Sequence, residues 1–178
     1  AIPKYHGEGW FVNVDVASYY PSLMLVYKWL SRNVHDPSKY AEIYHTRLKL
    51  KAEKNPMQQP YKIVLNSTYG AMKDKHNAMY DPRQANNVCV GGQLLLLDLI
   101  ERLEDHCEII QSNTDGILVK LRRYEDFEML DDLCWEWEQR TGMRLEFDEF
   151  QKVYQKDVNN YLWVGIDGGV ERIGAYVK

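Results

Sequence analysis

The sequence predicts an α+β fold, in which an antiparallel β-sheet is backed by helices and a pair of helices is inserted after the first strand. The first observation is the segment Trp10–Val16 (WFVNVDV), which alternates apolar and polar residues as a half-buried strand does. The second is a region of helical patterns from about residue 21 to residue 106. The third is the change after residue 107 to short β-type runs separated by turn signals.

Five helices are expected, and several begin or end at a recognised signal. Pro21 suits the first turn of the first helix, Asp36-Pro37 provides a cap and a first residue for the second, and Gly142 closes the last. The fourth helix is long and apolar on most faces, so we expect it to be buried. The expected helices cover about residues 21–30, 37–54, 57–70, 84–106 and 124–140.

The second half of the chain is expected to supply the other strands of the sheet. Two β-type runs, 107–111 and 116–121, flank Ser112-Asn113-Thr114-Asp115, and this arrangement predicts a hairpin. Later strands are expected over residues 144–153 and 161–164, and after the turn signal at 167–169.

Composition is that of an ordinary globular protein and places one limit on function. The 178 residues are 45% hydrophobic and 27% charged, which suits one core with a small lobe. The net charge of −4 argues against a general nucleic-acid binder, because such proteins usually have a basic surface. That argument weakens if the acidic groups are metal ligands, or if basic surfaces lie outside this chain.

The compartment is indicated by the cysteines and by the absence of long apolar runs. Cys89, Cys107 and Cys134 are scattered, which favours reduced thiols over a disulfide framework or a zinc site. The apolar run at 94–97 is far too short to cross a bilayer, so no membrane is expected as a partner. The chain begins with Ala1 and shows no signal peptide, so we expect a cytoplasmic fragment of a longer protein.

Four segments carry candidate chemistry, although each also has a plain structural explanation when it is taken alone. Asp15 ends the first strand just before a helix, which is a common position for a site residue and equally for a turn or cap. Arg47 and Lys51 are four residues apart on the second helix and therefore share a face. Two such cations can bind phosphate oxygens, or they can form a solvated basic surface.

The other two segments are a helix and a hairpin tip. In KIVLNSTYG, Lys62, Asn66 and Tyr69 stack on one helical face and offer a cation, an amide and an aromatic ring. That set suits phosphate, sugar and base together, and a polar helix face is the plain alternative. At the tip, Ser112–Gly116, Asp115 begins a strand after a tight turn, and Asp-Gly is by itself a common hairpin signal.

Together these segments resemble the family B DNA polymerases. The order is DVASYYPSL, then Arg-x-x-x-Lys on a helix, then KIVLNSTYG, then a Thr-Asp hairpin, and KIVLNSTYG is the most specific of the four. The resemblance covers about residues 10–161 and is greatest to compact members from bacteriophages and mobile elements. It implies a palm over residues 1–35 and 72–178, a fingers helical pair over 36–71, and exonuclease and thumb domains that are absent from this chain.

The resemblance also implies a role for each motif residue. Asp15 and Asp115 would be the catalytic ligands of two Mg²⁺ ions, for which Mn²⁺ can substitute, with the backbone carbonyl of Val16 as a further ligand. Tyr20 would stack under the incoming sugar and exclude a 2′-hydroxyl. The remaining implied contacts are to the nucleotide from Arg47, Lys51, Lys62, Asn66 and Tyr69, and to the primer from Thr114 and Tyr161.

Two positions depart from the family pattern. Asn113 stands where the family usually has a further Asp, so we expect weaker metal binding with activity retained. Asn159-Asn160-Tyr161 corresponds to a Lys-x-Tyr segment near the primer end, and the Lys is missing. The primer contact of that Lys is therefore lost or supplied elsewhere, and Tyr161 is equally explained as a strand-packing residue.

The resemblance therefore predicts the catalytic core of a template-directed DNA polymerase, which adds dNTPs to a primer 3′ end on primer-template DNA in a bacterial cell or a phage-infected host. By itself the fragment is expected to be weak or inactive. The alternative is a non-catalytic relative that serves as a binding or scaffolding module, favoured by Asn113 and the missing Lys. The intact set of phosphate-binding residues argues against it. A primase or reverse transcriptase would share the palm and lack the KIVLNSTYG helix.

Overall fold

The structure is a computed structural model that describes residues 4–175. Over this range the chain forms six strands and five helices, and the fold is α+β as predicted. In chain order the elements are β1 (Tyr5–Val16), α1 (Tyr19–Val26), α2 (Ser38–Ala52), α3 (Gln58–Lys73), α4 (Pro82–Leu103), β2 (Glu108–Ser112), β3 (Gly116–Leu121), α5 (Tyr124–Thr141), β4 (Leu145–Asp157), β5 (Asn160–Gly165) and β6 (Val170–Ile173).

The chain divides into two compact units, each of which is described by itself. One contains residues 1–17 and 94–178 and is called the sheet unit here. The other contains residues 18–93 and is called the helical unit. Helix α4 passes from the helical unit into the sheet unit along its length. The division into palm and fingers at residues 35 and 71 stays a prediction, since the compact units are defined by packing alone.

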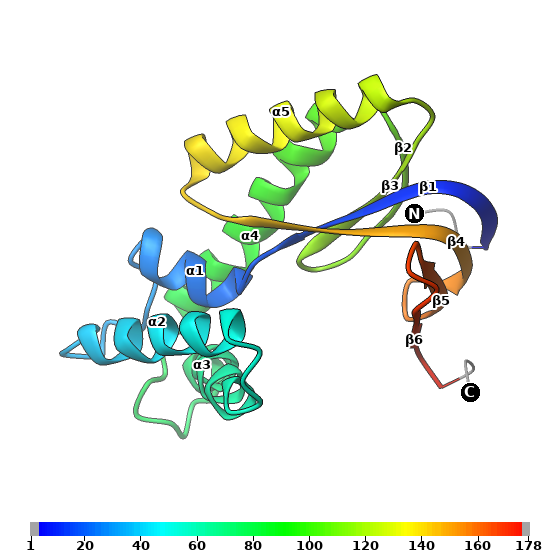
Figure 1. The fold of residues 1–178 in the computed structure, drawn as a ribbon. Coiled ribbons are helices and arrows are strands. Elements are labelled where there is room, and N and C mark those ends of the chain that lie inside the picture. Colours follow the sequence, from blue (N-terminus) through cyan, green and yellow to red (C-terminus); the bar gives the residue numbers. More distant parts are fainter. Residues whose placement is uncertain (1–3, 176–178) are drawn as a thin grey trace. The chain divides into compact units, whose positions relative to one another are not determined.

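All six strands belong to one antiparallel sheet, in the order β2-β3-β1-β4-β5-β6 (Figure 1). The long first strand lies in the middle and pairs with β3 on one side and β4 on the other. The predicted hairpin of β2 and β3 is present. At its end, β1 places Asp15 opposite Gly116 of β3 and Glu146 of β4.

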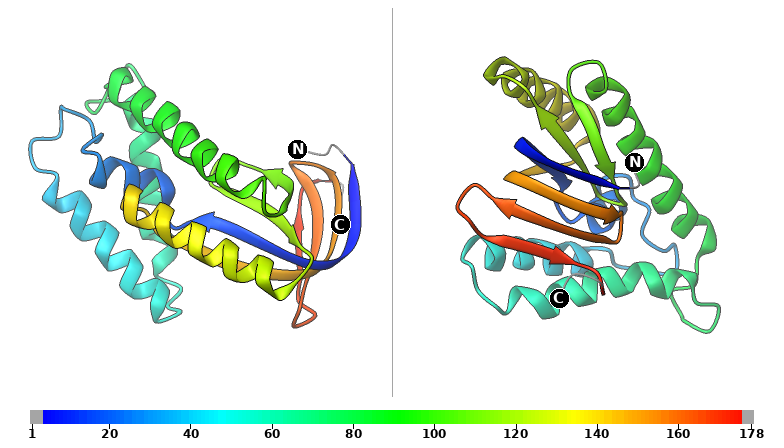
Figure 2. Two further views of the ribbon diagram at one scale, coloured as in Figure 1. Left: turned by 90° about the horizontal axis from the view of Figure 1, so that it is seen from above. Right: turned by 90° about the vertical axis from the view of Figure 1, so that its right-hand side faces the viewer.

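The two faces of β1 have different surroundings because successive side chains of a strand point to opposite faces. Trp10, Val12 and Val14 share one face, and the ring of Trp10 stacks on Phe127 of α5 with 5.3 Å between centroids. Helix α5 and the C-terminal part of α4 cover this face (Figures 1 and 2). Phe11, Asn13 and Asp15 therefore share the opposite face.

A second apolar cluster forms on that opposite face. Phe11 and Trp163 lie at its centre, and each is at most 1% exposed. The other members of the cluster are Ile110, Leu118, Phe150, Val153 and Tyr161. The cluster gives β1 a packed anchor on the same face as Asp15, four residues before that carboxylate.

The helical unit is built around the pair α2 and α3. The Tyr40 hydroxyl of α2 donates a hydrogen bond to the Leu65 carbonyl of α3, at 3.1 Å. The buried Asp81 carboxylate joins the start of α4 to the segment that follows α1. Arg32 of that segment donates to it from two guanidinium nitrogens, each at 2.8 Å. This hydrogen bonding by Arg32 holds the pKa of Asp81 below its usual value.

The expectation that the fourth helix is buried was wrong. Val90, Leu94 and Leu97 of α4 are between 47% and 60% exposed. The reason is geometric: apolar residues occupy more of this helix's circumference than its neighbours cover. Only the stripe that includes Val88 and Leu99 is fully packed. Within the described residues, no helix is long and apolar enough to cross a membrane.

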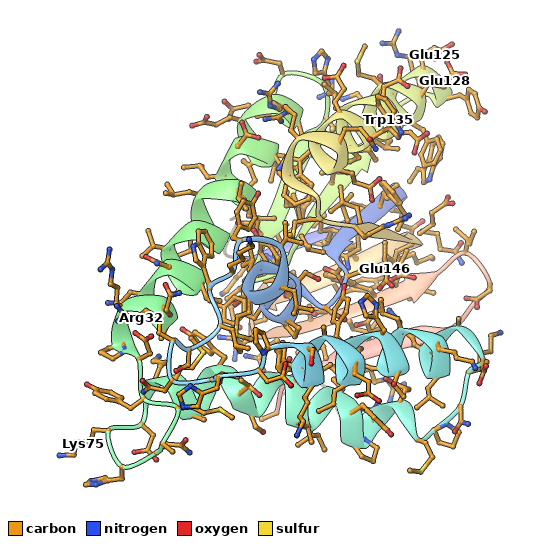
Figure 3. The ribbon with its side chains drawn as sticks, turned by 90° about the vertical axis from the view of Figure 1, so that its left-hand side faces the viewer. Arg32, Lys75, Glu125, Glu128, Trp135 and Glu146 are labelled. Atoms are coloured by element: carbon orange, nitrogen blue, oxygen red, sulfur yellow. The ribbon has the colours of Figure 1, made fainter. Side chains whose placement is uncertain are left out.

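The two units carry opposite net charges. The helical unit contains eleven Lys and Arg against five Asp and Glu, a net charge of +6. The sheet unit contains eleven against twenty-one, a net charge of −10. Figure 3 shows examples of each kind, with Lys75 in the helical unit and Glu125 and Glu128 on α5. The overall charge of −4 therefore conceals a basic unit, and it no longer argues against binding to nucleic acid.

Candidate active site

Asp15 and Asp115 are brought together by the pairing of β1 with the β2–β3 hairpin. The backbone N–H of Val16 donates to the carbonyl oxygen of Asp115, at 2.7 Å. Asp15 lies opposite Gly116, the next residue after Asp115. Two residues exactly one hundred positions apart in sequence thus have adjoining backbones at one end of the sheet.

Gly116 leaves the space that the Asp15 carboxylate occupies. A Cβ atom added at Gly116 would lie 1.8 Å from Asp15 Oδ1 and 3.2 Å from the carbonyl oxygen of Val14. The φ angle of Gly116 is not in the left-handed region, so backbone conformation does not explain the glycine. Its role here is clearance for Asp15.

The electrostatic surroundings of Asp15 disfavour its ionised form in the absence of a cation. The pKa of Asp15 is raised to about 6, first by burial and next by the charge of Asp115. Asp148 and Glu171 raise it further, while a hydrogen bond from the Asn13 side chain lowers it. A carboxylate in this setting gains stability from a nearby cation.

Asn113 supports the hairpin turn with its side-chain oxygen. Asn113 Oδ1 accepts hydrogen bonds from the backbone N–H groups of Asp115, at 3.1 Å, and Gly116, at 2.6 Å. The Asn113 N–H in turn donates to the Gly116 carbonyl, at 3.0 Å. Asn113, which stands where the family usually has an Asp, therefore fixes the backbone that carries Asp115.

The carboxylates fit a hard divalent cation that completes its ligand shell from elsewhere. Oxygen donors suit Mg²⁺, which keeps several waters and substrate oxygens as ligands. Asp15 is partly buried and Asp115 is exposed at the tip of the hairpin, so the pair is open on one side. Among residues 4–175, no group of three or more His, Cys, Asp or Glu side chains is arranged to hold a metal by itself. A metal here would depend on these two carboxylates and on the ligands it brings.

The two residues expected to contact the primer have different surroundings. Thr114 is exposed at the hairpin tip. Tyr161 is only 8% exposed, and its ring stacks on Trp163 with 4.2 Å between centroids. Burial, followed by the charges of Glu171 and the two aspartates, raises the pKa of Tyr161 to about 12. The packing explanation of Tyr161 is thus supported, and its contact with a primer stays a prediction.

In the helical unit, Arg47 is held against the turn that precedes α1. Its guanidinium Nη1 donates to the Ser18 hydroxyl, and the residue is 7% exposed. Ser18 adopts the left-handed conformation with φ 48° and makes no side-chain cap bond to its own helix. Lys51, one turn further along α2, is partly exposed. Arg47 is therefore part of a packed surface, whereas a solvated basic face would leave its guanidinium in water.

The face of α3 that was expected to bind a nucleotide is open at one end and packed at the other. Lys62 and Asn66 are exposed. The ring of Tyr69 meets that of Tyr20 edge to face, at 4.6 Å between centroids. Lys73 Nζ lies 5.4 Å from the centre of the Tyr69 ring. Within this unit, the structure brings Tyr20 and Tyr69 together from segments about fifty residues apart.

Several residues near these groups were not predicted to matter. Gly116 was considered only as a turn signal, because its closeness to Asp15 depends on strand register. Ser18 lies inside the DVASYYPSL motif, yet its contact with Arg47 depends on tertiary packing. Asn13 could have been found from the alternation of β1, since it shares a face with Asp15.

Comparison with known proteins supports a polymerase fold. DNA polymerase II of Escherichia coli (strain K12) is 29% identical over 97 residues, which are 53% of this chain and 12% of that protein. The solved structure of the family B DNA polymerase from the hyperthermophilic archaeon Pyrobaculum calidifontis matches with a TM-score of 0.68 and 19% identity. That match covers 94% of this chain and 28% of the archaeal chain. The chain has the fold of a family B DNA polymerase segment.

The family B resemblance of the motifs is thereby confirmed, and the antiparallel sheet with its helices is consistent with a polymerase palm. The chain spans 12% of the length of the bacterial polymerase and 28% of the archaeal chain. No protein-family model matches it. The likeness to bacteriophage and mobile-element members stays a prediction.

Proposed function

We propose that this chain is the catalytic core of a template-directed DNA polymerase, which adds dNTPs to the 3′ end of a primer paired with its template. The observation that carries the proposal is the adjoining placement of Asp15 and Asp115, with the Val16 N–H bound to the Asp115 carbonyl. The names of the two relatives agree with this activity, although each is much longer than this chain.

The sheet unit would hold the metal ions through oxygen atoms. Asp15 and Asp115 supply carboxylates, and the Val16 carbonyl lies at the same strand end. Two bound Mg²⁺ ions would lower the pKa of the primer 3′-hydroxyl and neutralise the charge of the departing pyrophosphate. Asn113 would keep Asp115 in position through its bonds to the turn, while the Gly116 clearance lets Asp15 face the same ions.

The helical unit would bind the triphosphate and the sugar. Arg47, Lys51 and Lys62 supply three cations on two packed helices, and Arg can bind phosphate oxygens in a bidentate way. Tyr20 would lie under the sugar, and its contact with Tyr69 would hold the ring where it excludes a 2′-hydroxyl. Sequence would be read by base pairing with the template, so the protein needs no contacts that distinguish bases.

The competing proposal is a non-catalytic module that keeps this fold for binding or scaffolding. Asn113 favours it, since an amide replaces a charged metal ligand. The raised pKa of Asp15 opposes it, because a scaffold has no need of a partly buried carboxylate beside another one.

Primer extension with purified protein separates the two proposals. Asp15→Asn and Asp115→Asn should each reduce dNTP incorporation by about a thousandfold or more, because the reaction then lacks a charged metal ligand. Asp132→Asn, which removes an exposed carboxylate of α5, is the matched control and should be as active as the unmodified chain. Binding of Mn²⁺ and dNTP by the 178-residue chain provides a second readout. If the unmodified chain binds neither, the catalytic proposal loses its support in this chain.

A further inference from the structure

The side of α5 that points away from the sheet is a surface that the proposed reaction does not use. Helix α5 covers the sheet on the side of Trp10 and Val12, whereas Asp15 lies on the opposite side (Figures 1 and 2). The inward side of α5 is packed, and the Trp137 Nε1–H there donates to the Leu95 carbonyl, at 2.9 Å. The outward side of the helix is exposed.

Two large aromatic side chains are exposed on this outward side. Tyr124 is 65% exposed and Trp135 is 60% exposed. They are eleven residues apart, which is close to three helical turns, so they lie on one side of α5 and about 16 Å apart along its axis. Tryptophan is highly buried in most proteins and is enriched at the centres of binding interfaces. An aligned Tyr and Trp that the fold leaves uncovered therefore indicate a contact surface.

Carboxylates lie between and beside the two rings. Glu128 and Asp132 follow Tyr124 at intervals of four residues, so they share its side of the helix, and Glu136 continues the row. All three carboxylates are exposed. Figure 3 labels Glu128 and Trp135 on this helix. These two aromatic and three acidic residues are called the outer face of α5 here.

The charge of the outer face of α5 is not balanced within the protein. Helix α5 contains seven Asp and Glu residues and one basic residue, Arg140. Arg140 binds Asp98 of α4 at 2.9 Å, and Arg123 before the helix binds Asp126 at 3.4 Å. The three carboxylates of the outer face form no salt bridge with any described residue. Like charges four residues apart destabilise a helix, and a bound cationic group would remove that repulsion.

The combination of rings and carboxylates defines the class of partner. Nucleic acid and the anionic surface of a lipid membrane are repelled by the carboxylates. A metal ion would leave both rings unused. A protein segment with Lys or Arg beside apolar side chains uses both kinds of group, because its cations pair with the carboxylates and also bind over the rings, and its apolar side chains cover the rings.

We propose that the outer face of α5 binds a basic amphipathic segment of a partner protein, with Trp135 as the main apolar anchor and Glu128 and Asp132 as the charge contacts. The contact goes beyond the proposed polymerase reaction, because it needs neither the metal ligands nor a dNTP. It would attach another protein to the sheet unit while the face of the sheet that carries Asp15 stays open to substrate.

Fluorescence anisotropy with a labelled synthetic peptide tests the proposal on the 178-residue chain. The peptide consists of Lys and Leu, spaced to form an amphipathic helix, and the same peptide with Gln in place of Lys should bind about tenfold more weakly. Trp135→Ala should weaken binding of the Lys peptide by about ten- to a hundredfold, and Trp135→Phe should weaken it less because a ring remains. The double variant Glu128→Gln and Asp132→Asn should weaken binding at low salt and reduce its salt dependence.

Two exposed residues of α4 provide matched controls. Leu94 is as exposed as Trp135, at 60%, and Glu101 is an exposed carboxylate outside the outer face of α5. Leu94→Ala and Glu101→Gln should bind the peptide as the unmodified chain does. Circular dichroism and thermal unfolding check that each variant is folded. Asp132→Asn should lose affinity for the peptide and still extend a primer, whereas Asp15→Asn should bind the peptide normally and fail to extend one, which keeps this proposal separate from the polymerase proposal.

Three results would overturn the proposal. One is an unmodified chain that binds the Lys and Gln peptides equally, or binds neither. Another is a Trp135→Ala variant that binds the Lys peptide as well as the unmodified chain does, because the attraction would then be a general property of the acidic sheet unit. The third is a concentration-dependent dimer in sedimentation analysis that Trp135→Ala abolishes, which would assign the outer face of α5 to a second copy of this chain.

Discussion

The rings of Tyr20 and Tyr69 meet edge to face with 4.6 Å between their centroids. The contact joins the first turn of α1 to the last part of α3, so two motifs that are far apart in the sequence meet at one pair of rings. Edge-to-face pairs of this kind contribute about 0.5–1.5 kcal/mol beyond their buried area. If Tyr20 excludes ribonucleotides, Tyr69 should influence that selection through its contact with Tyr20.

Tyr20→Ala should therefore increase ribonucleotide incorporation, and Tyr69→Ala should increase it by about two- to tenfold through loss of the ring contact. Tyr69→Phe retains the ring and should select as the unmodified protein does. Competition between dNTP and rNTP in primer extension measures the ratio. The double variant should match Tyr20→Ala alone, and fully additive effects would show that the two rings act independently.

Asp15→Asn should stabilise the metal-free chain at neutral pH even though it abolishes incorporation. The folded-state pKa of Asp15, about 6, is above the ordinary value of 3.8 for an aspartate, so the folded chain holds this proton more tightly. That contribution to stability is full below pH 3.8, is lost as the pH rises through 6, and leaves the ionised group destabilising above it. The variant should gain about 1–3 kcal/mol in free energy of unfolding at pH 7.5 and little at pH 4. Thermal unfolding in EDTA checks this, and equal stabilities at pH 7.5 would contradict it.

Gly116→Ala should inactivate the protein by displacing a carboxylate in the opposite strand. The new Cβ would lie 1.8 Å from Asp15 Oδ1, so the Asp15 side chain must move. A displacement of about 1 Å at a reacting centre can lower the rate about a hundredfold. Primer extension measures the loss, and near-neutral stability would show that the fold tolerates the change. Gly70→Ala is the control, because a Cβ there meets no atom within 4 Å.

Asn113→Asp should strengthen metal binding without disturbing the hairpin. A carboxylate oxygen can accept the same two backbone hydrogen bonds that Asn113 Oδ1 accepts now. The added charge would favour a cation beside Asp115, so the Mg²⁺ concentration for half-maximal activity should fall by about three- to tenfold. Asn113→Ala should instead lose both bonds and about 1–3 kcal/mol of stability. An unchanged Mg²⁺ dependence in Asn113→Asp would show that position 113 does not face the metal.

Ser18→Ala should raise the KM for dNTP by about three- to tenfold with little change in kcat, because the Arg47 guanidinium loses a hydrogen-bond partner. Ser22→Ala is a matched control, because it removes the hydrogen bond between the Ser22 hydroxyl of α1 and the Tyr44 hydroxyl of α2, at 3.0 Å. Ser18→Gly should show the same KM but higher stability than Ser18→Ala, because glycine adopts a φ of 48° without strain. Equal KM values in Ser18→Ala and Ser22→Ala would mean that the contact only joins the helices.

Local signals explain why most elements were predictable. The hairpin of β2 and β3 followed from an Asp-Gly pair between two apolar runs, and α5 ends at Gly142 in the left-handed conformation that such helix ends favour. Helix α4 was misjudged because composition shows how apolar a helix is, and only packing shows how much of it is covered. The exposed Leu94 and Leu97 are the result.

The residues of the candidate site could be predicted from the sequence, but their arrangement in space could be predicted only in part. The motif order identified Asp15 and Asp115, but their adjoining backbones depend on the register between β1 and β3. The same register gives Gly116 its role, because it places that glycine opposite Asp15. Contacts between distant segments, such as Arg47 with Ser18, depend on helix packing that no local pattern encodes.

The opposite charges of the two units have a practical consequence for handling the protein. With a sequence pI of 5.8, the chain should be retained by an anion exchanger at pH 8, as its −10 sheet unit requires. Its +6 helical unit should also let it bind a sulphated matrix such as heparin at the same pH. A protein that behaves as an anion on one column and as a polycation on the next has its charge unevenly distributed. Its net charge is therefore a poor guide to which charged surfaces it will bind.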